Sequence, residues 1–121
     1  MASSSMTFLF DQSVDADLTA AVDLRGAYIH EIIMPAAWTA ASVVAHCCET
    51  ATGTYEPFQL YGSTEPVEIK VEAGVRSGAL SPLQIGDCFV KLQSIAVGDT
   101  TTGVNQAADR TLLVKVFQVG E

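Results

Sequence analysis

Residues 67–73 are the segment that most constrains how this chain can fold. Their sequence, VEIKVEA, strictly alternates apolar and charged side chains. Successive side chains of a β-strand point to opposite faces, so the four apolar residues would face a core and the three charged ones would face water. A helix would scatter the same residues around its circumference. The pattern therefore predicts a strand in an antiparallel sheet that has one wet face.

Other short apolar segments alternate in a similar way and are separated by turns rich in Gly, Pro and Thr. Many short strands with such turns predict an all-β fold, a single antiparallel β-sandwich of jelly-roll-like type. Residues 49–54 are expected to form a hairpin loop, residues 74–86 to be mostly loop, and residues 98–109 to form a polar loop. The expected strands cover residues 7–10, 18–24, 27–34, 40–48, 55–61, 67–73, 88–96 and 110–119.

The composition indicates a packed domain with more apolar side chains than one small core can bury. The chain has 121 residues, of which 49 % are apolar and 17 % are charged. This length fits one domain, and the low charge is the opposite of what disordered chains show. A body this small has a high ratio of surface to volume, so some apolar side chains are expected to be buried between subunits. We therefore expect a homo-oligomer.

The net charge of −8 excludes several classes of partner. Such a chain repels phosphate backbones, and its few Lys and Arg residues form no cluster, so we expect no direct nucleic-acid binding and no binding to anionic membranes. No apolar run approaches the roughly 20 residues that span a bilayer. Residues 1–5 lack the features of a signal peptide, which predicts synthesis in the cytoplasm.

The sequence offers no convincing catalytic or metal-binding motif. His46 is followed by two cysteines, but zinc ligands are spaced differently, and Cys88 would have to approach from another strand. We therefore expect reduced, packed thiols. Asp11, Asp15 and Asp17 are expected to form a solvated acidic loop, because a calcium loop needs denser oxygen ligands. The prediction is a protein that is not an enzyme and has no cofactor and no metal.

Two groups of apolar residues are candidates for subunit contacts. Residues 1–12 would form an N-terminal arm that adds as a strand to a neighbouring subunit, ahead of a sandwich domain of residues 13–121; the alternative is that the segment pairs within its own sheet. If it is an arm, deleting residues 2–10 should leave a soluble fold. Aromatic residues around Pro57 would mark an interface at a sheet edge. The candidate interface residues are Met6, Phe8, Leu9, Phe10, Trp38, Tyr55, Phe58 and Tyr61.

Two stretches resemble small proteins encoded among the head genes of tailed bacteriophages. One runs over residues 21–41, from AVDLRG to IIMPAAWTAA, and the other is VNQAADRTL at residues 104–112. The resemblance covers most of residues 21–118 and is specific only in these stretches. It departs at residues 43–54, VVAHCCETATGT, where such relatives carry a hairpin of the F-Q-V-S-x-D-G-x-T type.

The resemblance implies a capsid decoration (cement) protein that is β-rich and located on the outside of the virion. Its partners would be the major capsid protein and other copies of itself, as a trimer. Two alternatives stay open: a tail, head-fibre or adaptor component, or a carbohydrate-binding module. The last would need a sugar platform made from Trp38, Tyr55 and Tyr61.

Overall fold

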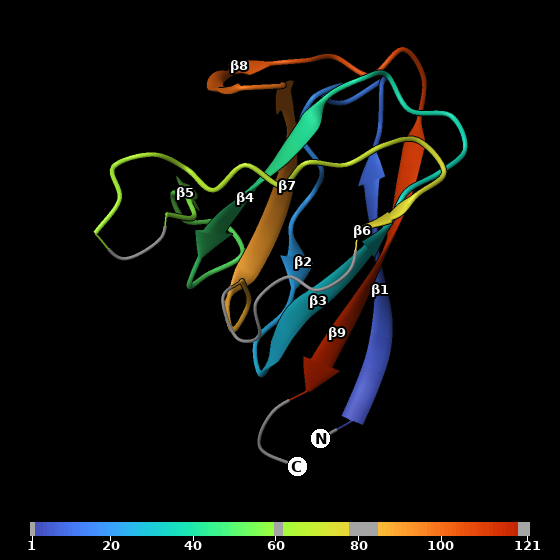
Figure 1. The fold of residues 1–121 in the computed structure, drawn as a ribbon. Helices are drawn as coiled ribbons and strands as arrows, with labels where there is room; N and C mark the ends of the chain where they lie inside the picture. Colours follow the sequence, from blue (N-terminus) through green and yellow to red (C-terminus); the bar gives the residue numbers. More distant parts are fainter. Residues whose placement is uncertain (1, 60–61, 78–84, 119–121) are drawn as a thin grey trace.

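Two antiparallel sheets pack face to face in the computed structural model, which describes residues 2–59, 62–77 and 85–118 (Figure 1). This confirms the predicted β-sandwich. Within those residues, no helix is long and apolar enough to span a membrane. The first sheet has the strand order β1 (Ala2–Phe10), β9 (Arg110–Gln118), β3 (Ala27–Ile33) and β6 (Arg76–Ser77). The second has the order β2 (Val22–Asp23), β7 (Phe89–Ala96), β4 (Ser42–Cys48) and β5 (Glu56–Pro57), and β8 (Asp99–Gly103) pairs with β7.

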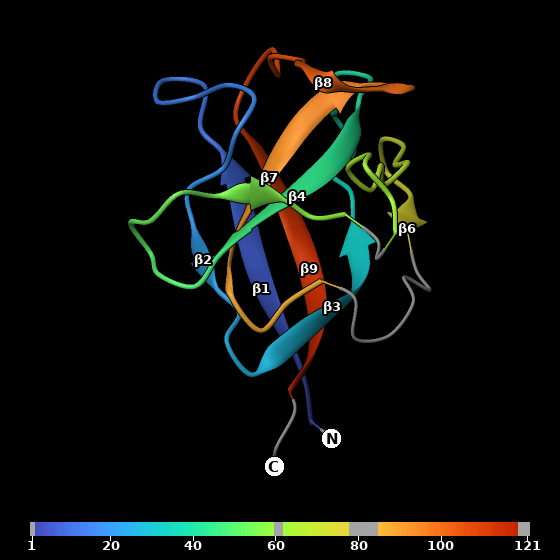
Figure 2. The same ribbon diagram turned by 90° about the vertical axis from the view of Figure 1, so that its left-hand side faces the viewer.

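Apart from β8, the strands pair in nested order: the two outermost in the sequence pair with each other, as do the two innermost. β4 pairs with β5, β3 with β6, β2 with β7 and β1 with β9, and successive pairs alternate between the two sheets. Links between β9 and β3 and between β7 and β4 complete the sheets. This nesting is the eight-stranded jelly roll, with β8 as an additional strand. Figure 2 shows β4 and β7 lying in front of β1, β9 and β3.

Alternation along each long strand places the core between the sheets. On β1 Phe8 and Phe10 are fully buried, whereas Leu9 between them is 44 % exposed. The ring of Phe10 meets Trp38 edge to face, with 5.4 Å between ring centres. The buried cluster also contains Leu24, Ile29, Ile32, Val43, Val90, Leu92, Leu112, Val114 and Val116.

Residues 2–10 form β1, which lies in the sheet of its own chain and not apart from the sandwich. β1 pairs with β9 along its whole length, from Ala2 opposite Gln118 to Phe10 opposite Arg110. The strand is longer than the predicted residues 7–10 because β9 offers a complete partner edge. Since β1 supplies Phe8 and Phe10 to the core, we now expect deletion of residues 2–10 to unfold the protein, contrary to the sequence-based expectation.

The segment with the clearest alternation is not a regular strand, which corrects the prediction for residues 67–73. On the apolar side Ile69 is buried in the core, and Val67 and Val71 pack against it partly buried, whereas Ala73 is exposed, contrary to the prediction. Ile69 makes one isolated bridge to Val43, with N–H to O distances of 2.8 and 2.9 Å. The next positions of β4 are occupied by the β5 segment, where Phe58 bonds the carbonyl of Ala45. A longer ladder with β4 therefore has no free edge.

Glu68 also departs from the prediction that it faces water. Its carboxylate accepts hydrogen bonds from the hydroxyl of Ser42 (2.6 Å) and the N–H of Gly98 (3.0 Å). These two bonds lower the pKa of Glu68, and the Ser42 bond contributes most. The side chain thus ties its segment to the start of β4 and to the turn between β7 and β8.

Three other expectations about strands needed correction. Residues 98–109 are not a plain loop, because β8 lies within them; the Asp99 carboxylate orders that hairpin by accepting the Thr102 hydroxyl at 2.7 Å. The expected strand at 18–24 shrinks to β2, with one further isolated bridge from Leu18 to Gln93. In the described part of 55–61 the strand shrinks to β5, with an isolated bridge from Gln59 to Pro66, and residues 60–61 lie outside the described residues. The strands expected over 27–34, 40–48, 88–96 and 110–119 are confirmed within one or two residues where the structure describes them.

Candidate functional site

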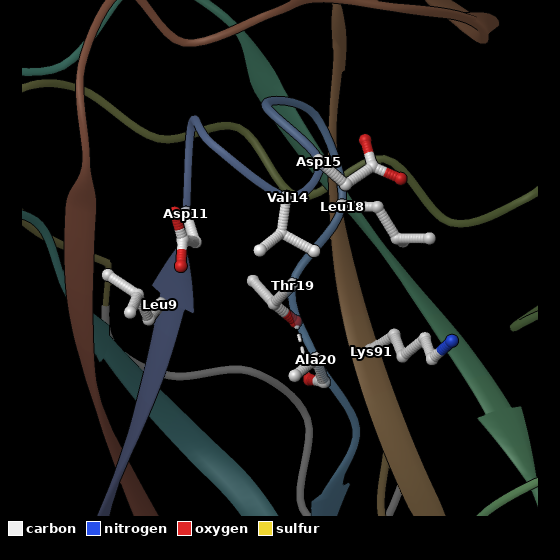
Figure 3. Close-up of a pocket in the computed structure, with 8 residues that line it drawn as sticks. All are labelled: Leu9, Asp11, Val14, Asp15, Leu18, Thr19, Ala20 and Lys91. Atoms are coloured by element: carbon white, nitrogen blue, oxygen red, sulfur yellow. Dashed lines mark hydrogen bonds between the residues drawn. The ribbon is translucent and has the colours of Figure 1, made fainter.

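A mainly apolar hollow of about 270 Å³ opens at the β1 edge of the sandwich. Figure 3 shows Leu9 on β1 and Val14 on the following turn on one side of it, and Lys91 of β7 on the other. The turn is held by Asp11, whose carbonyl accepts the N–H of Val14 at 2.9 Å. As a result Val14 is 80 % exposed at the rim. The remaining lining residues are Asp11, Asp15, Leu18, Thr19 and Ala20.

The carboxylates beside this hollow are held in the protein's own turns. Asp11 accepts the Ser13 hydroxyl at 2.7 Å, and Asp17 accepts the side-chain amide of Gln93 at 3.3 Å. A hydrogen bond with Asp17 raises the pKa of Asp15, and burial contributes in the same direction. Among the residues that the structure describes, no group of three or more His, Cys, Asp or Glu is arranged to hold a metal ion.

A second hollow, of about 410 Å³, opens near β6, at the opposite edge of the first sheet. Val75 just before β6 is 45 % exposed, and Val97 in the β7–β8 turn is 64 % exposed. The hydrogen bonds of Glu68 to Ser42 and Gly98 hold two of its walls together. The lining residues are Ser42, Lys70, Val71, Glu72, Val75 and Val97.

Exposed apolar side chains gather in these two hollows. Among described residues, the large apolar side chains that are exposed are Leu9, Val14, Val75, Val97 and Leu113. All except Leu113 line one hollow or the other. Leu113 lies on the outer face of the first sheet, where it is opposite Thr7 and Ile33. The arrangement is suited to contact with other protein surfaces at two opposite edges.

Most of the predicted interface residues lie in or against the core. Phe8 and Phe10 are fully buried, and Trp38 is 9 % exposed, with its indole N–H bonded to the carbonyl of Ala41 at 3.2 Å. Met6 and Phe58 are partly buried and pack against the same cluster. Of the predicted residues that the structure describes, Leu9 is the one that is clearly exposed, at 44 %.

The proposed sugar platform is not assembled. Trp38 is in the core, as described above, and Tyr55 is half-buried near β4, with its hydroxyl bonded to the carbonyl of Ala51 at 2.8 Å. The ammonium group of Lys91 lies 4.5 Å from the centre of the Tyr55 ring. Tyr61, the third member, lies outside the described residues. Stacking of a sugar on Trp38 would require the core to open.

The histidines and cysteines singled out in the sequence do not form a metal cluster. His46 Nε2 lies 2.8 Å from Oε1 of Gln93, and the Cys48 thiol lies 3.8 Å from the Thr50 hydroxyl. His30 stacks on Phe117, with ring centres 4.1 Å apart. The three cysteines are free thiols, of which Cys88 is buried.

The two stretches that carry the resemblance meet in space. The side chain of Gln106, which is 1 % exposed, accepts the N–H of Thr39 at 2.8 Å and donates to its carbonyl at 3.0 Å. The Thr39 hydroxyl in turn accepts the N–H of Ala107 at 3.1 Å. These hydrogen bonds hold the two stretches together and stabilise the fold.

In comparisons with protein-family models, with curated proteins and with solved structures, no match was found. The sequence had indicated neither hollow. One usable signal was present: Val14 stands alone among Gln, Ser and Asp, where a turn offers it no core to enter. Val97 gave no such signal, because its neighbours Ala96 and Gly98 are small, and Val75 stands between Gly74 and Arg76 in a segment that was expected to be mostly loop.

Proposed function

We propose that this protein is a non-enzymatic virion structural protein that binds the outside of a phage capsid and stabilises it, as a trimer. The observation that carries the proposal is the pair of apolar hollows at opposite edges of the sandwich. A closed ring brings two different surfaces of each subunit together at every interface. The Leu9–Val14 hollow of one copy would face the Val75–Val97 hollow of the next.

The capsid as the partner is supported by the resemblance of residues 21–41 and 104–112 to phage head proteins. A protein that binds only the assembled, expanded shell stabilises that shell by mass action. Such a protein needs self-association and a surface for the shell, and it needs no reaction centre. The net charge of −8 would keep the outer surface well solvated.

The test combines native mass with co-sedimentation. We expect a trimer by light scattering, or a monomer that trimerises on empty expanded capsids, with saturable binding to those capsids. Val14→Asp and Val97→Asp should each weaken self-association and reduce capsid occupancy at a fixed protein concentration. Thr52→Asp, which adds the same charge at an exposed site in the β4–β5 turn, is the matched control and should behave like the wild type.

The outcomes separate this proposal from its alternatives. A stable monomer that ignores capsids would contradict it. A sixfold or twelvefold ring would move the protein to a tail or adaptor role. If Val14→Asp and Thr52→Asp reduce the mass equally, the charge alone is responsible and the hollows are not the contacts.

A further inference from the structure

A third hollow, of about 480 Å³, brings all three cysteines to one place. Cys47 and Cys48 end β4, and Cys88 immediately precedes β7. Cys47 lies opposite Val90 in the β4–β7 ladder, so Cys88 is its diagonal neighbour. Diagonal neighbours have Cα atoms about 7 Å apart, just beyond the usual span of a disulfide.

Cys47 and Cys88 both line this hollow, and the pKa of each thiol is shifted mainly by the other. Cys48, in contrast, is near Thr50 in the following turn. Diagonal neighbours share a face of the sheet, so the side chains of Cys47 and Cys88 lie on the same face of the β4–β7 ladder. A small approach of β4 and β7 would bring their sulfur atoms to bonding distance.

The two thiols are not equivalent as nucleophiles. The neighbouring Cys47 lowers the pKa of Cys88, whereas Cys88, together with burial, raises the pKa of Cys47. Because the thiolate is the reactive form, these pKa directions favour Cys88 as the thiol that attacks first. Cys88 is 5 % exposed but lines the hollow, which gives a small reagent a route to it.

The wall of the hollow is acidic. The side chains of Glu49, Glu56 and Asp87 line it together with the cysteines. A cleft with one sign of charge concentrates small molecules of the opposite sign and repels those of the same sign. Cationic reagents should therefore reach Cys88 more readily than anionic ones.

We propose that Cys47 and Cys88 form a dithiol site that reacts with cationic low-molecular-weight disulfides to give a reversible disulfide between β4 and β7. The Cys88 thiolate attacks one sulfur of the small disulfide and breaks its S–S bond. The first aminothiolate leaves and takes up the proton that Cys88 lost. Cys47 then loses its proton and attacks the Cys88 sulfur, which releases the second aminothiol. Two electrons pass from the protein to the reagent, and one S–S bond replaces another. This reaction is independent of the capsid role.

The test uses the full chain with cystamine, a dicationic disulfide, and with anionic glutathione disulfide at equal concentration and low ionic strength. Intact mass should show loss of two hydrogens, and peptide mapping of the wild type should join Cys47 to Cys88. The rate with cystamine should exceed the rate with glutathione disulfide about tenfold. Added salt should shrink that difference, and dithiothreitol should restore the thiols.

Three variants assign the steps. Cys47→Ser should stop at a stable mixed disulfide on Cys88, Cys88→Ser should give no disulfide between residues 47 and 88, and Cys48→Ser should react like the wild type. A bond that includes Cys48, or a mass that shows only reagent adducts on the wild type, would overturn the proposal. Equal rates with the two reagents would overturn the role of the acidic wall. Mapping of the wild type decides the pairing even if a variant folds poorly.

Discussion

Gln106 binds the backbone of Thr39 as a neighbouring strand would, with its side-chain amide accepting the N–H and donating to the carbonyl of the same residue. The amide also donates to the hydroxyl of Ser94 at 2.9 Å, and Arg110 lies 3.4 Å from its oxygen. The N–H of Gln106 itself bonds the carbonyl of Ala16 at 2.9 Å. One buried polar residue thus holds three loops and β7 together.

Replacing Gln106 by Ala should therefore destabilise the protein more than an ordinary loop substitution does. The change leaves the N–H and carbonyl of Thr39 without their partner in a buried place, which we expect to lower the free energy of unfolding by about 2–3 kcal/mol. Urea unfolding of Gln106→Ala measures it. The adjacent, exposed Asn105→Ala is the control and should change stability by less than about 0.5 kcal/mol. Similar values for the two variants would mean that the amide is not holding the loops.

Phe10 and Leu9 give a direct test of how β1 is placed. Phe10 is fully buried against Trp38, so Phe10→Ala should lower the free energy of unfolding by about 3–5 kcal/mol. Leu9 is 44 % exposed, so Leu9→Ala should lower the free energy of unfolding by less than about 1 kcal/mol. Thermal unfolding of the two variants compares them. If residues 1–12 formed a free arm, both substitutions would leave the unfolding temperature nearly unchanged.

Gly86 should tolerate no side chain. A Cβ there would lie 2.1 Å from the carbonyl oxygen of Ala27 and 2.7 Å from Cα of Tyr28, and both atoms belong to the backbone of β3. Gly98 also has a positive φ, of 81°, but its Cβ would meet open space. We expect Gly98→Ala to lower the free energy of unfolding by about 1–2 kcal/mol through backbone strain alone. Gly86→Ala should lower it clearly more, because the collision adds to the strain. Denaturant unfolding of both separates collision from strain, and equal losses would argue against the close approach.

Acid should destabilise the protein, in part through Glu68. Hydrogen bonds from Ser42 and Gly98 lower the folded-state pKa of Glu68, and Arg25 lowers the pKa of Asp23 to about 2. A carboxylate whose folded-state pKa is depressed contributes stability above its unfolded pKa of about 4, and that contribution is lost as the pH falls through the folded value. The free energy of unfolding should therefore decrease as the pH is lowered from about 5 to about 2.

Glu68→Gln isolates the part of this effect that belongs to one residue. It should be less stable than the wild type by about 1 kcal/mol at pH 7 and should converge with it at low pH. Glu65→Gln, at an exposed neighbouring site, should keep the full pH dependence. A Glu68→Gln curve that runs parallel to the wild type would show that the two hydrogen bonds do not depend on the charge.

The sequence predicted the features that follow from alternation. The fold class, the long strands at residues 27–33, 89–96 and 110–118, and the burial of Ile69 follow from a period of two. Phe8 and Phe10 were instead expected at an interface, and the structure places them in the core. Pairing is a different matter, since it depends on which edges are free. Ile69 has one bridge because β5 occupies the next part of β4, and no pattern within residues 67–73 contains that information.

The candidate surfaces were harder to predict because they are made by turns. Leu9 was expected at an interface, but its companion Val14 owes its exposure to the carbonyl of Asp11, and Val97 to the hairpin that Asp99 orders. The placement of Cys47 beside Cys88 arises from the register of β4 against β7, which sets which residues become diagonal neighbours. Sequence spacing alone placed them far apart.

The pairing of β1 with β9 makes β1 dependent on a strand that is synthesised much later. While the ribosome is still producing the chain, Phe8 and Phe10 have no partner strand, and the edge of β1 is open to any other extended segment. Completion of the sandwich therefore waits for a contact of very long sequence separation, which favours slow folding. A cell that makes many copies at once would be exposed to exchange of first strands between chains during that interval.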